Sequence, residues 1–166
     1  MPRLTGSYES ARQETEGVLR RVYIKDVFDL PVVQQPANNP YYVSDRADEI
    51  TQFSMVSQYG NLGLLAHNTL AGKHFSQLAI GQELRLMYEN GRSEYFVVTE
   101  ILRFQALQPD SVSSSFRNLE GNDVLSAVEM FNHVYVGGDR LVLQTCIEAR
   151  ENPSWGRLFV IAVPKK

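Results

Sequence analysis

The chain has one cysteine among its 166 residues, Cys146, and few long apolar runs. A single cysteine excludes both a disulfide within the chain and a thiolate cluster for structural zinc. The longest apolar run, Leu158 to Val163, is far shorter than the roughly 20 residues that a membrane helix needs. The first residues, Met1 to Gly6, contain no apolar stretch of signal-peptide type. We therefore expect neither a membrane helix nor a signal peptide in this chain.

An excess of positive charge is also missing. The chain has 16 basic against 19 acidic side chains, a formal net charge of -3 and a pI near 5.6. Because no basic field is available for a phosphate backbone, nucleic acid is not an expected partner. The 43% of hydrophobic residues is ordinary for a soluble globular protein, which excludes disordered and collagen-like chains.

The length suits one domain with a short appendage. Residues 1–17 are polar and predict a tail or lead-in, so the domain is expected over residues 18–166. From Val18 to Val33 the chain is rich in β-branched residues, which favour strands. The best helix candidate is Ser44 to Tyr59, with Ser44 as its cap and Gly60 as its stop.

The rest of the chain has the pattern of short strands. The dipeptide Asn90-Gly91 predicts a tight hairpin turn between strands at 83–88 and 93–104. Further strands are expected at 62–66, 140–146 and 157–163, loops at 109–122 and 147–156, and a short helix at 123–133 capped by Asp123. This order predicts a closed, mostly antiparallel or mixed β-barrel of seven to eight strands, with a β-sandwich as the alternative.

Cys146 ends an apolar run and is followed by a polar segment, which predicts a thiol at the end of a strand. A nucleophilic thiol needs a base or a cation to form the thiolate, and a donor for the developing oxyanion. Arg157 opens the next strand, so an antiparallel return would bring it beside Cys146. Three histidines, His67, His74 and His133, are candidates for the base, and spacing alone does not rank them.

Four segments together resemble a known family. Leu143-Gln144-Thr145-Cys146 is similar to a Leu-x-Thr-Cys nucleophile motif, and Ala66-His67 follows a short apolar strand. Arg157 heads an apolar Leu-Phe-Val run, and Leu30-Pro31-Val32 lies near the start. In this order they resemble the sortases, cysteine transpeptidases of bacterial cell surfaces, over residues 18–164.

The resemblance implies a sortase-like barrel with a catalytic triad. Cys146 would form a thioester with a short sorting-type peptide motif, and His67 would act as acid and then base. Arg157 would stabilise the oxyanion or anchor the substrate. Thr145 would contact the oxyanion or substrate, and Trp155 would be a loop anchor or a wall of the substrate groove. The partners implied are a peptide or protein substrate and an amine nucleophile.

The chain departs from the family pattern in three places. Ile147 stands where an acidic residue or proline commonly follows the cysteine, and Leu141 or Val142 stands where the family commonly has threonine. Family members are generally tethered by an N-terminal membrane helix, and we expect no such helix within these 166 residues. We expect a membrane contact only through a segment outside this chain, and a cell-surface location if the chain is an excised catalytic domain. The sortase subclass stays open.

Some members of the family bind calcium in a loop, and three acids border the long loop here: Glu120, Asp123 and Glu129. Their spacing is not that of a calcium-binding loop, so we expect no cofactor and keep calcium as the alternative. Three other functions remain open. They are a non-catalytic peptide-binding module, a hydrolytic thiol peptidase, and a redox sensor that uses Cys146 alone.

Overall fold

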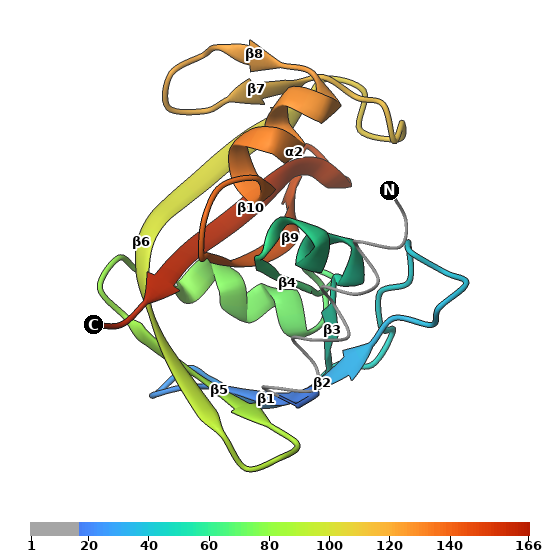
Figure 1. Ribbon diagram of the computed structural model, residues 1–166. Coiled ribbons are helices and arrows are strands. Elements are labelled where there is room, and N and C mark those ends of the chain that lie inside the picture. Colours follow the sequence, from blue (N-terminus) through green and yellow to red (C-terminus); the bar gives the residue numbers. More distant parts are fainter. Residues whose placement is uncertain (1–16) are drawn as a thin grey trace.

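The structure, a computed structural model, describes residues 17–166 and forms one closed barrel with a small extension (Figure 1). The tail expected for residues 1–17 therefore lies outside the described residues except for Gly17. The strands are β1 Leu19–Ile24, β2 Phe28–Gln34, β3 Ile50–Gln52, β4 Leu62–Leu65, β5 Glu83–Tyr88, β6 Ser93–Ala106, β7 Phe116–Asn118, β8 Val124–Leu125, β9 Leu141–Ala149 and β10 Asn152–Pro164. The helices are the 3₁₀ helices η1 Ser54–Tyr59 and η2 Ala71–Gln77, and the α-helix α2 Ala127–Tyr135.

Eight strands close the barrel in the order β10-β9-β4-β3-β2-β1-β5-β6, and β10 pairs again with β6. The β2–β3 and β4–β9 pairs are parallel and the other pairs of the ring are antiparallel. β7 and β8 extend the sheet beyond β6. The predicted closed, mixed barrel is thus confirmed, and the sandwich alternative is wrong.

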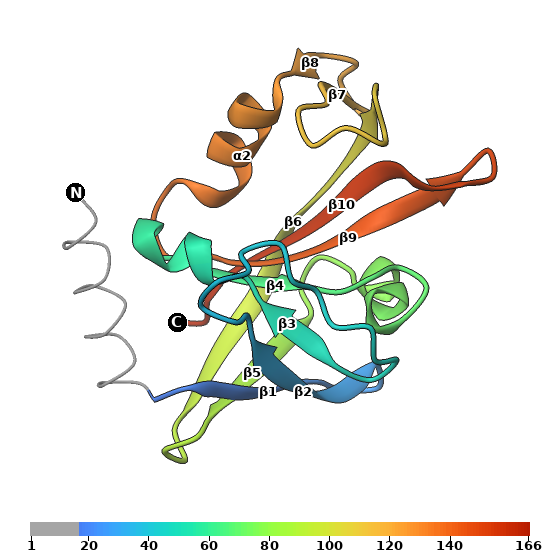
Figure 2. The ribbon, with the colours of Figure 1, turned by 90° about the vertical axis from the view of Figure 1, so that its right-hand side faces the viewer.

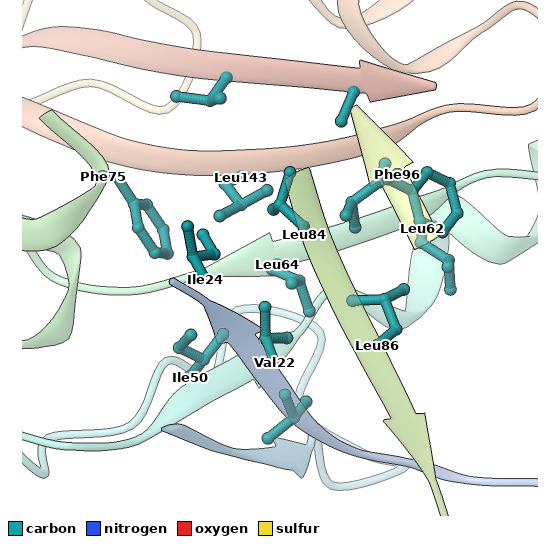
Figure 3. Packing of buried hydrophobic residues seen from close by; sticks show 14 of the residues in the cluster. Val22, Ile24, Ile50, Leu62, Leu64, Phe75, Leu84, Leu86, Phe96 and Leu143 are labelled. Carbon is teal, nitrogen blue, oxygen red and sulfur yellow. The ribbon is translucent and has the colours of Figure 1, made fainter. Parts of the chain in front are cut away.

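The core lies on both faces of β9 and β10. Alternate residues such as Leu141 and Leu143 point into the barrel, where they pack with buried side chains of the other strands and of η2 (Figure 3). The residues between them, such as Val142 on β9 and Phe159 on β10, pack on the outer face against α2 and β7. Because both faces are buried, these strands show continuous apolar runs instead of alternation.

The helix predicted for residues 44–59 is wrong. Residues 44–49 form a loop, Ile50–Gln52 is β3, and only Ser54–Tyr59 is helical, as a 3₁₀ helix ending at Gly60 in the left-handed conformation. Ser44 does not cap a helix, because its hydroxyl donates to Glu49 (2.7 Å) and its amide donates to Thr51 (2.8 Å). These local bonds compete with helix formation, and Ile50 and Thr51 fit the parallel ladder with β2.

The second helix exists but starts later than predicted. Ser126, and not Asp123, caps α2, and it forms a capping box with Glu129. Val124 and Leu125 belong to β8, and the loop predicted at 109–122 contains β7. No helix within residues 17–166 is long and apolar enough to cross a membrane.

The loop predicted at residues 147–156 is instead a hairpin that projects beyond the barrel (Figure 2). β9 continues to Ala149 and β10 starts at Asn152, and these two residues are register partners. Arg150 and Glu151 form the two-residue turn with φ of 50° and 63°. Such a turn favours Asn-Gly, and because Arg-Glu stands at positions 150–151 no local signal for this hairpin is present in the sequence.

Replacing Arg150-Glu151 by Asn-Gly should stabilise the hairpin, because side chains at these positive φ angles are strained. We expect the free energy of unfolding to rise by about 1 kcal/mol, measured by chemical denaturation. The control is Ala-Ala at the same two positions, which removes the same charges but keeps the strain. An equal gain in the Ala-Ala protein would show that charge, not backbone conformation, limits stability there.

Candidate active site

Cys146 and Arg157 lie directly opposite each other on adjacent strands. They are register partners in the antiparallel β9–β10 pair, as expected for an antiparallel return. Register partners point to the same face of a sheet, here the outer face that also carries Phe159. Cys146 is a free thiol and is half-buried, as is Arg157. The pair therefore sets a cation beside a partly accessible thiol.

The Arg157 guanidinium is held by backbone carbonyls and an aromatic ring. Its Nη1 donates to the carbonyls of Ser154 and Gly156, both at 3.0 Å, and its Cζ lies 5.6 Å from the centre of the Phe116 ring. The carbonyl of Ser154 is available because the register shifts between Asn152 and Gly156. Among residues 17–166 no carboxylate pairs with Arg157, so its charge is not neutralised locally.

Trp155 lies in the same irregular part of β10 and is half-buried. This position, two residues before Arg157, is compatible with both roles expected for it. A contact between Trp155 and a substrate stays a prediction.

His67 lies at the same end of the barrel, just after β4. In the parallel β4–β9 pair, Leu65 is the partner of Gln144. His67 is two residues beyond Leu65, and Cys146 is two residues beyond Gln144, so the two lie at the same level along their strands. The backbone of β4 leaves the ladder after the Ala66 amide donates to the Gln144 carbonyl at 3.3 Å.

Two hydrogen bonds flank His67 and tie its segment to the β9–β10 hairpin. On one side, the Thr145 hydroxyl donates to the Ala66 carbonyl at 2.7 Å. On the other side, the Asn68 side-chain amide donates to the Pro153 carbonyl at 3.2 Å. The hairpin that carries Cys146 and Arg157 therefore also fixes the backbone on both sides of His67.

Thr145 is 5% exposed and its hydroxyl is engaged inside the barrel. Gly72 packs so closely on it that an added Cβ would lie 2.3 Å from the Thr145 hydroxyl oxygen and 2.7 Å from the Ala66 and His67 carbonyl oxygens. Only glycine fits there without a shift. The structure thus gives Thr145 a positioning contact, and its contact with a substrate stays a prediction.

The His67 imidazole is exposed and faces a carboxylate. Its side chain is 46% exposed, and Nε2 lies 3.8 Å from Asp45 Oδ1. Asp45 is 99% exposed, so a contact of this kind contributes little to stability. The helix predicted over residues 44–59 gave no reason to expect Asp45 beside His67, whereas residues 44–49 form a loop in the structure.

A pocket of about 320 Å³ adjoins Cys146 on the barrel side. It is lined by Asn68, Gly72, Lys73, Ser76, Arg103, Leu119, Thr145, Cys146, Ile147, Glu148 and Leu158. His67 and Arg157 are outside this lining, so the structure does not gather the three predicted catalytic residues around one cavity. It brings Cys146 and Arg157 together and places His67 on a segment fixed to their hairpin.

The other two histidines have different surroundings. His74 was expected in a surface loop but belongs to η2, where its ring packs 5.8 Å from Phe28. Its Nδ1 is buried and has no hydrogen-bond partner. His133 is exposed on α2.

The three acids considered for calcium are not gathered into a site. Glu129 accepts a hydrogen bond from the Ser126 amide at 3.0 Å, and this bond lowers the pKa of its carboxyl. Over the described part of the chain, no group of three or more histidine, cysteine, aspartate or glutamate side chains is placed to hold a metal ion.

The hydrogen bonds that hold α2 against β9, the strand of Cys146, were also not predicted from the sequence. The buried Tyr135 hydroxyl is hydrogen-bonded to the Gln144 side chain, and burial raises the pKa of Tyr135. Asn61 donates to the carbonyls of Tyr135 (2.6 Å) and Gly137 (2.8 Å), and accepts from the Arg140 amide at 2.9 Å. These bonds hold α2 and the start of β9 in one arrangement.

No family model matches the chain, and no curated protein matches it significantly. Several solved structures are similar to the chain in fold. Sortase A of Listeria monocytogenes has a TM-score of 0.56 at 13% identity, covering 90% of this chain and 88% of its own. Sortase C1 of Streptococcus suis has a TM-score of 0.60 at 14% identity, covering 97% and 80%.

A third similar structure is Clostridium perfringens sortase C with the C-terminal cell wall sorting motif, with a TM-score of 0.60 at 14% identity, covering 99% of this chain and 86% of its own. Together with the closed barrel, these likenesses establish that the protein has the sortase fold. At such identities they establish the fold alone.

Thr145→Val should loosen the segment that carries His67, because it leaves the buried Ala66 carbonyl without its donor. We expect the free energy of unfolding to fall by about 1–3 kcal/mol and the amides of residues 66–72 to exchange faster with deuterium. Thr145→Ser keeps the hydroxyl and is the matched control. Equal protection of residues 66–72 in both variants would contradict the positioning contact.

Proposed function

We propose that this sortase-fold protein is a cysteine transpeptidase with Cys146 as nucleophile, His67 as acid and base, and Arg157 as oxyanion donor. The observation that carries the proposal is the register of β9 and β10, which sets an unneutralised guanidinium beside the only thiol. The hydrogen bonds from Thr145 and Asn68 support the choice of His67 over His74 and His133, because they tie its segment to the same hairpin.

In the first half of the reaction, the Cys146 thiol gives its proton to His67 and the sulfur attacks the carbonyl carbon of a peptide bond. The C–N bond breaks, His67 gives a proton to the leaving amine, and the acyl group stays on sulfur as a thioester. In the second half, an incoming amine attacks the thioester, His67 takes its proton, and the Cys146 sulfur leaves. With water in place of the amine, the same steps would make the protein a peptidase.

His67 must come within hydrogen-bond reach of the reacting groups for these proton transfers. Its side chain is exposed, and exposed side chains change rotamer on the picosecond to nanosecond timescale. The imidazole can therefore turn from Asp45 towards the reacting groups, and catalytic hydrogen bonds commonly tighten only when the substrate is bound.

The proposed substrate is a peptide with a sorting-type motif, displayed at a cell surface. The similar Clostridium perfringens sortase C, whose structure includes a C-terminal cell wall sorting motif, supports a peptide as the donor of the acyl group. The amine acceptor and the surface location are proposed with it from the fold likeness.

The proposal is tested by mixing the protein with a pooled library of Leu-Pro-x-Thr-Gly-like peptides and measuring intact mass. We expect a peptide-sized adduct on Cys146 that an added amine discharges. Cys146→Ala and His67→Ala should each abolish product formation, since the first removes the nucleophile and the second removes the proton carrier. His133→Ala is the matched control for His67→Ala and should retain turnover.

The outcomes separate the competing functions. Discharge by water at an undiminished rate, with no amine product, would identify a peptidase. Peptide binding without an adduct, unchanged in Cys146→Ala, would replace the proposal by a binding module. Ready oxidation of Cys146 by mild peroxide, with no need for His67 or Arg157, would favour a redox sensor.

Arg157→Lys should lower kcat/KM by about 100-fold or more, because an ammonium group does not reproduce the guanidinium fork. The surrounding carbonyls of Ser154 and Gly156 orient that fork in the wild-type protein. Arg117→Lys, an exposed arginine on β7, is the matched control and should change turnover little. Near-normal turnover of Arg157→Lys would remove Arg157 from its assigned role.

A further inference from the structure

The pocket beside Cys146 contains two cations that no described group neutralises. Lys73 on η2 and Arg103 on β6 both line it, and both are exposed. Within residues 17–166 neither side chain makes an ion pair or a side-chain hydrogen bond. Glu148 is the only acid in the lining, so the charged side chains of the pocket sum to one positive charge.

The register of the sheet explains why these groups meet. Arg103 is the partner of Leu158, and Leu158 is the partner of Thr145, so one row crosses β6, β10 and β9. Register partners share a face, so this row forms the floor of the pocket. η2 forms one wall of the pocket, since Gly72 packs on Thr145 and Lys73 follows Gly72 directly.

The pocket also reaches the nucleophile. Cys146, Ile147 and Glu148 line it in succession, at an edge of β9 where no described strand pairs beyond Ala66. Because Cys146 borders the same pocket, a group bound between Lys73 and Arg103 would belong to a molecule that lies close to Cys146. Both cations recognise carboxylates, arginine as a planar fork and lysine as a point charge.

We propose that this pocket selects for a carboxylate carried by one of the two reactants, with Lys73 and Arg103 as its specificity-determining residues. The proposal rests on the proposed function of Cys146. The carboxylate belongs either to the peptide that Cys146 attacks or to the amine that discharges the thioester. Glu148 opposes it and limits the selectivity.

The charge of the pocket is tested without turnover by alkylating Cys146 in the full chain with iodoacetate and with iodoacetamide. These probes differ by one carboxylate, and with both the thiolate displaces iodide. We expect the ratio of the iodoacetate rate to the iodoacetamide rate to fall about two- to fivefold in Lys73→Gln and in Arg103→Gln. In Glu148→Gln the ratio should rise by a similar factor.

Lys166→Gln is the matched control, because it removes one positive charge near the C-terminus, away from the hairpin (Figure 2). Arg157 raises the same ratio in all variants, so the comparison between variants is the informative one. Circular dichroism checks that each variant is folded. Ratios in Lys73→Gln and Arg103→Gln equal to that of Lys166→Gln would overturn the proposal.

Two further arms identify the source of the carboxylate. Thioester formation is compared between peptides with Asp and Asn next to the scissile bond, and discharge is compared between glycine and glycinamide. In each arm the rate with the carboxylate compound is divided by the rate with its amide, and this ratio is compared between wild type and Lys73→Gln. The intrinsic reactivity of the two amines is the same in both proteins and therefore cancels. A change in the first arm assigns the carboxylate to the peptide, and a change in the second assigns it to the amine.

If the preference changes in neither arm, the proposal is overturned, even if the alkylation ratios respond. If no thioester forms with any peptide, the proposed function fails. The alkylation ratios would then still decide separately whether the pocket attracts a carboxylate.

Discussion

The pairing of β10 with β6 on one side and β9 on the other is the constraint on which the rest of the structure depends. It closes the barrel, and it sets Arg157 against Cys146. A slip of one residue would turn every side chain of β10 to the opposite face. The register is protected because Val160 packs inside the barrel while Phe159 packs outside, so a slip would exchange two differently shaped cores.

The elements that sequence analysis predicted correctly are those whose signal is local. Asn90-Gly91 sets the β5–β6 hairpin within a few residues, and the apolar runs of β4, β9 and β10 reveal strands buried on both faces. The adjacency of Cys146 and Arg157 needed only the assumption of an antiparallel return. The helix predicted for residues 44–59 is wrong because β3 forms through its pairing with β2 and β4, two strands that lie outside this segment.

The parts of the candidate site that sequence analysis missed arise from contacts between distant segments. The Thr145 bond to Ala66 spans 79 residues and the Asn68 bond to Pro153 spans 85. Lys73 and Arg103 come from a 3₁₀ helix and a strand with no shared motif. The resemblance to the sortases implied Cys146, His67 and Arg157, but only the folded barrel shows which backbone groups hold them and which cations adjoin Cys146.

Cys146 and Arg157 are held rigidly in the candidate site, whereas the His67 side chain is free to change its rotamer. Cys146 and Arg157 are on paired strands, and the arginine is further held by two carbonyls and a ring. Only the backbone around His67 is anchored, and its imidazole is exposed. Fixed oxyanion donors and nucleophiles lower the cost of reorganisation during reaction. A side chain that carries protons to and from successive amines has to turn between them, so the freedom of His67 fits its proposed role.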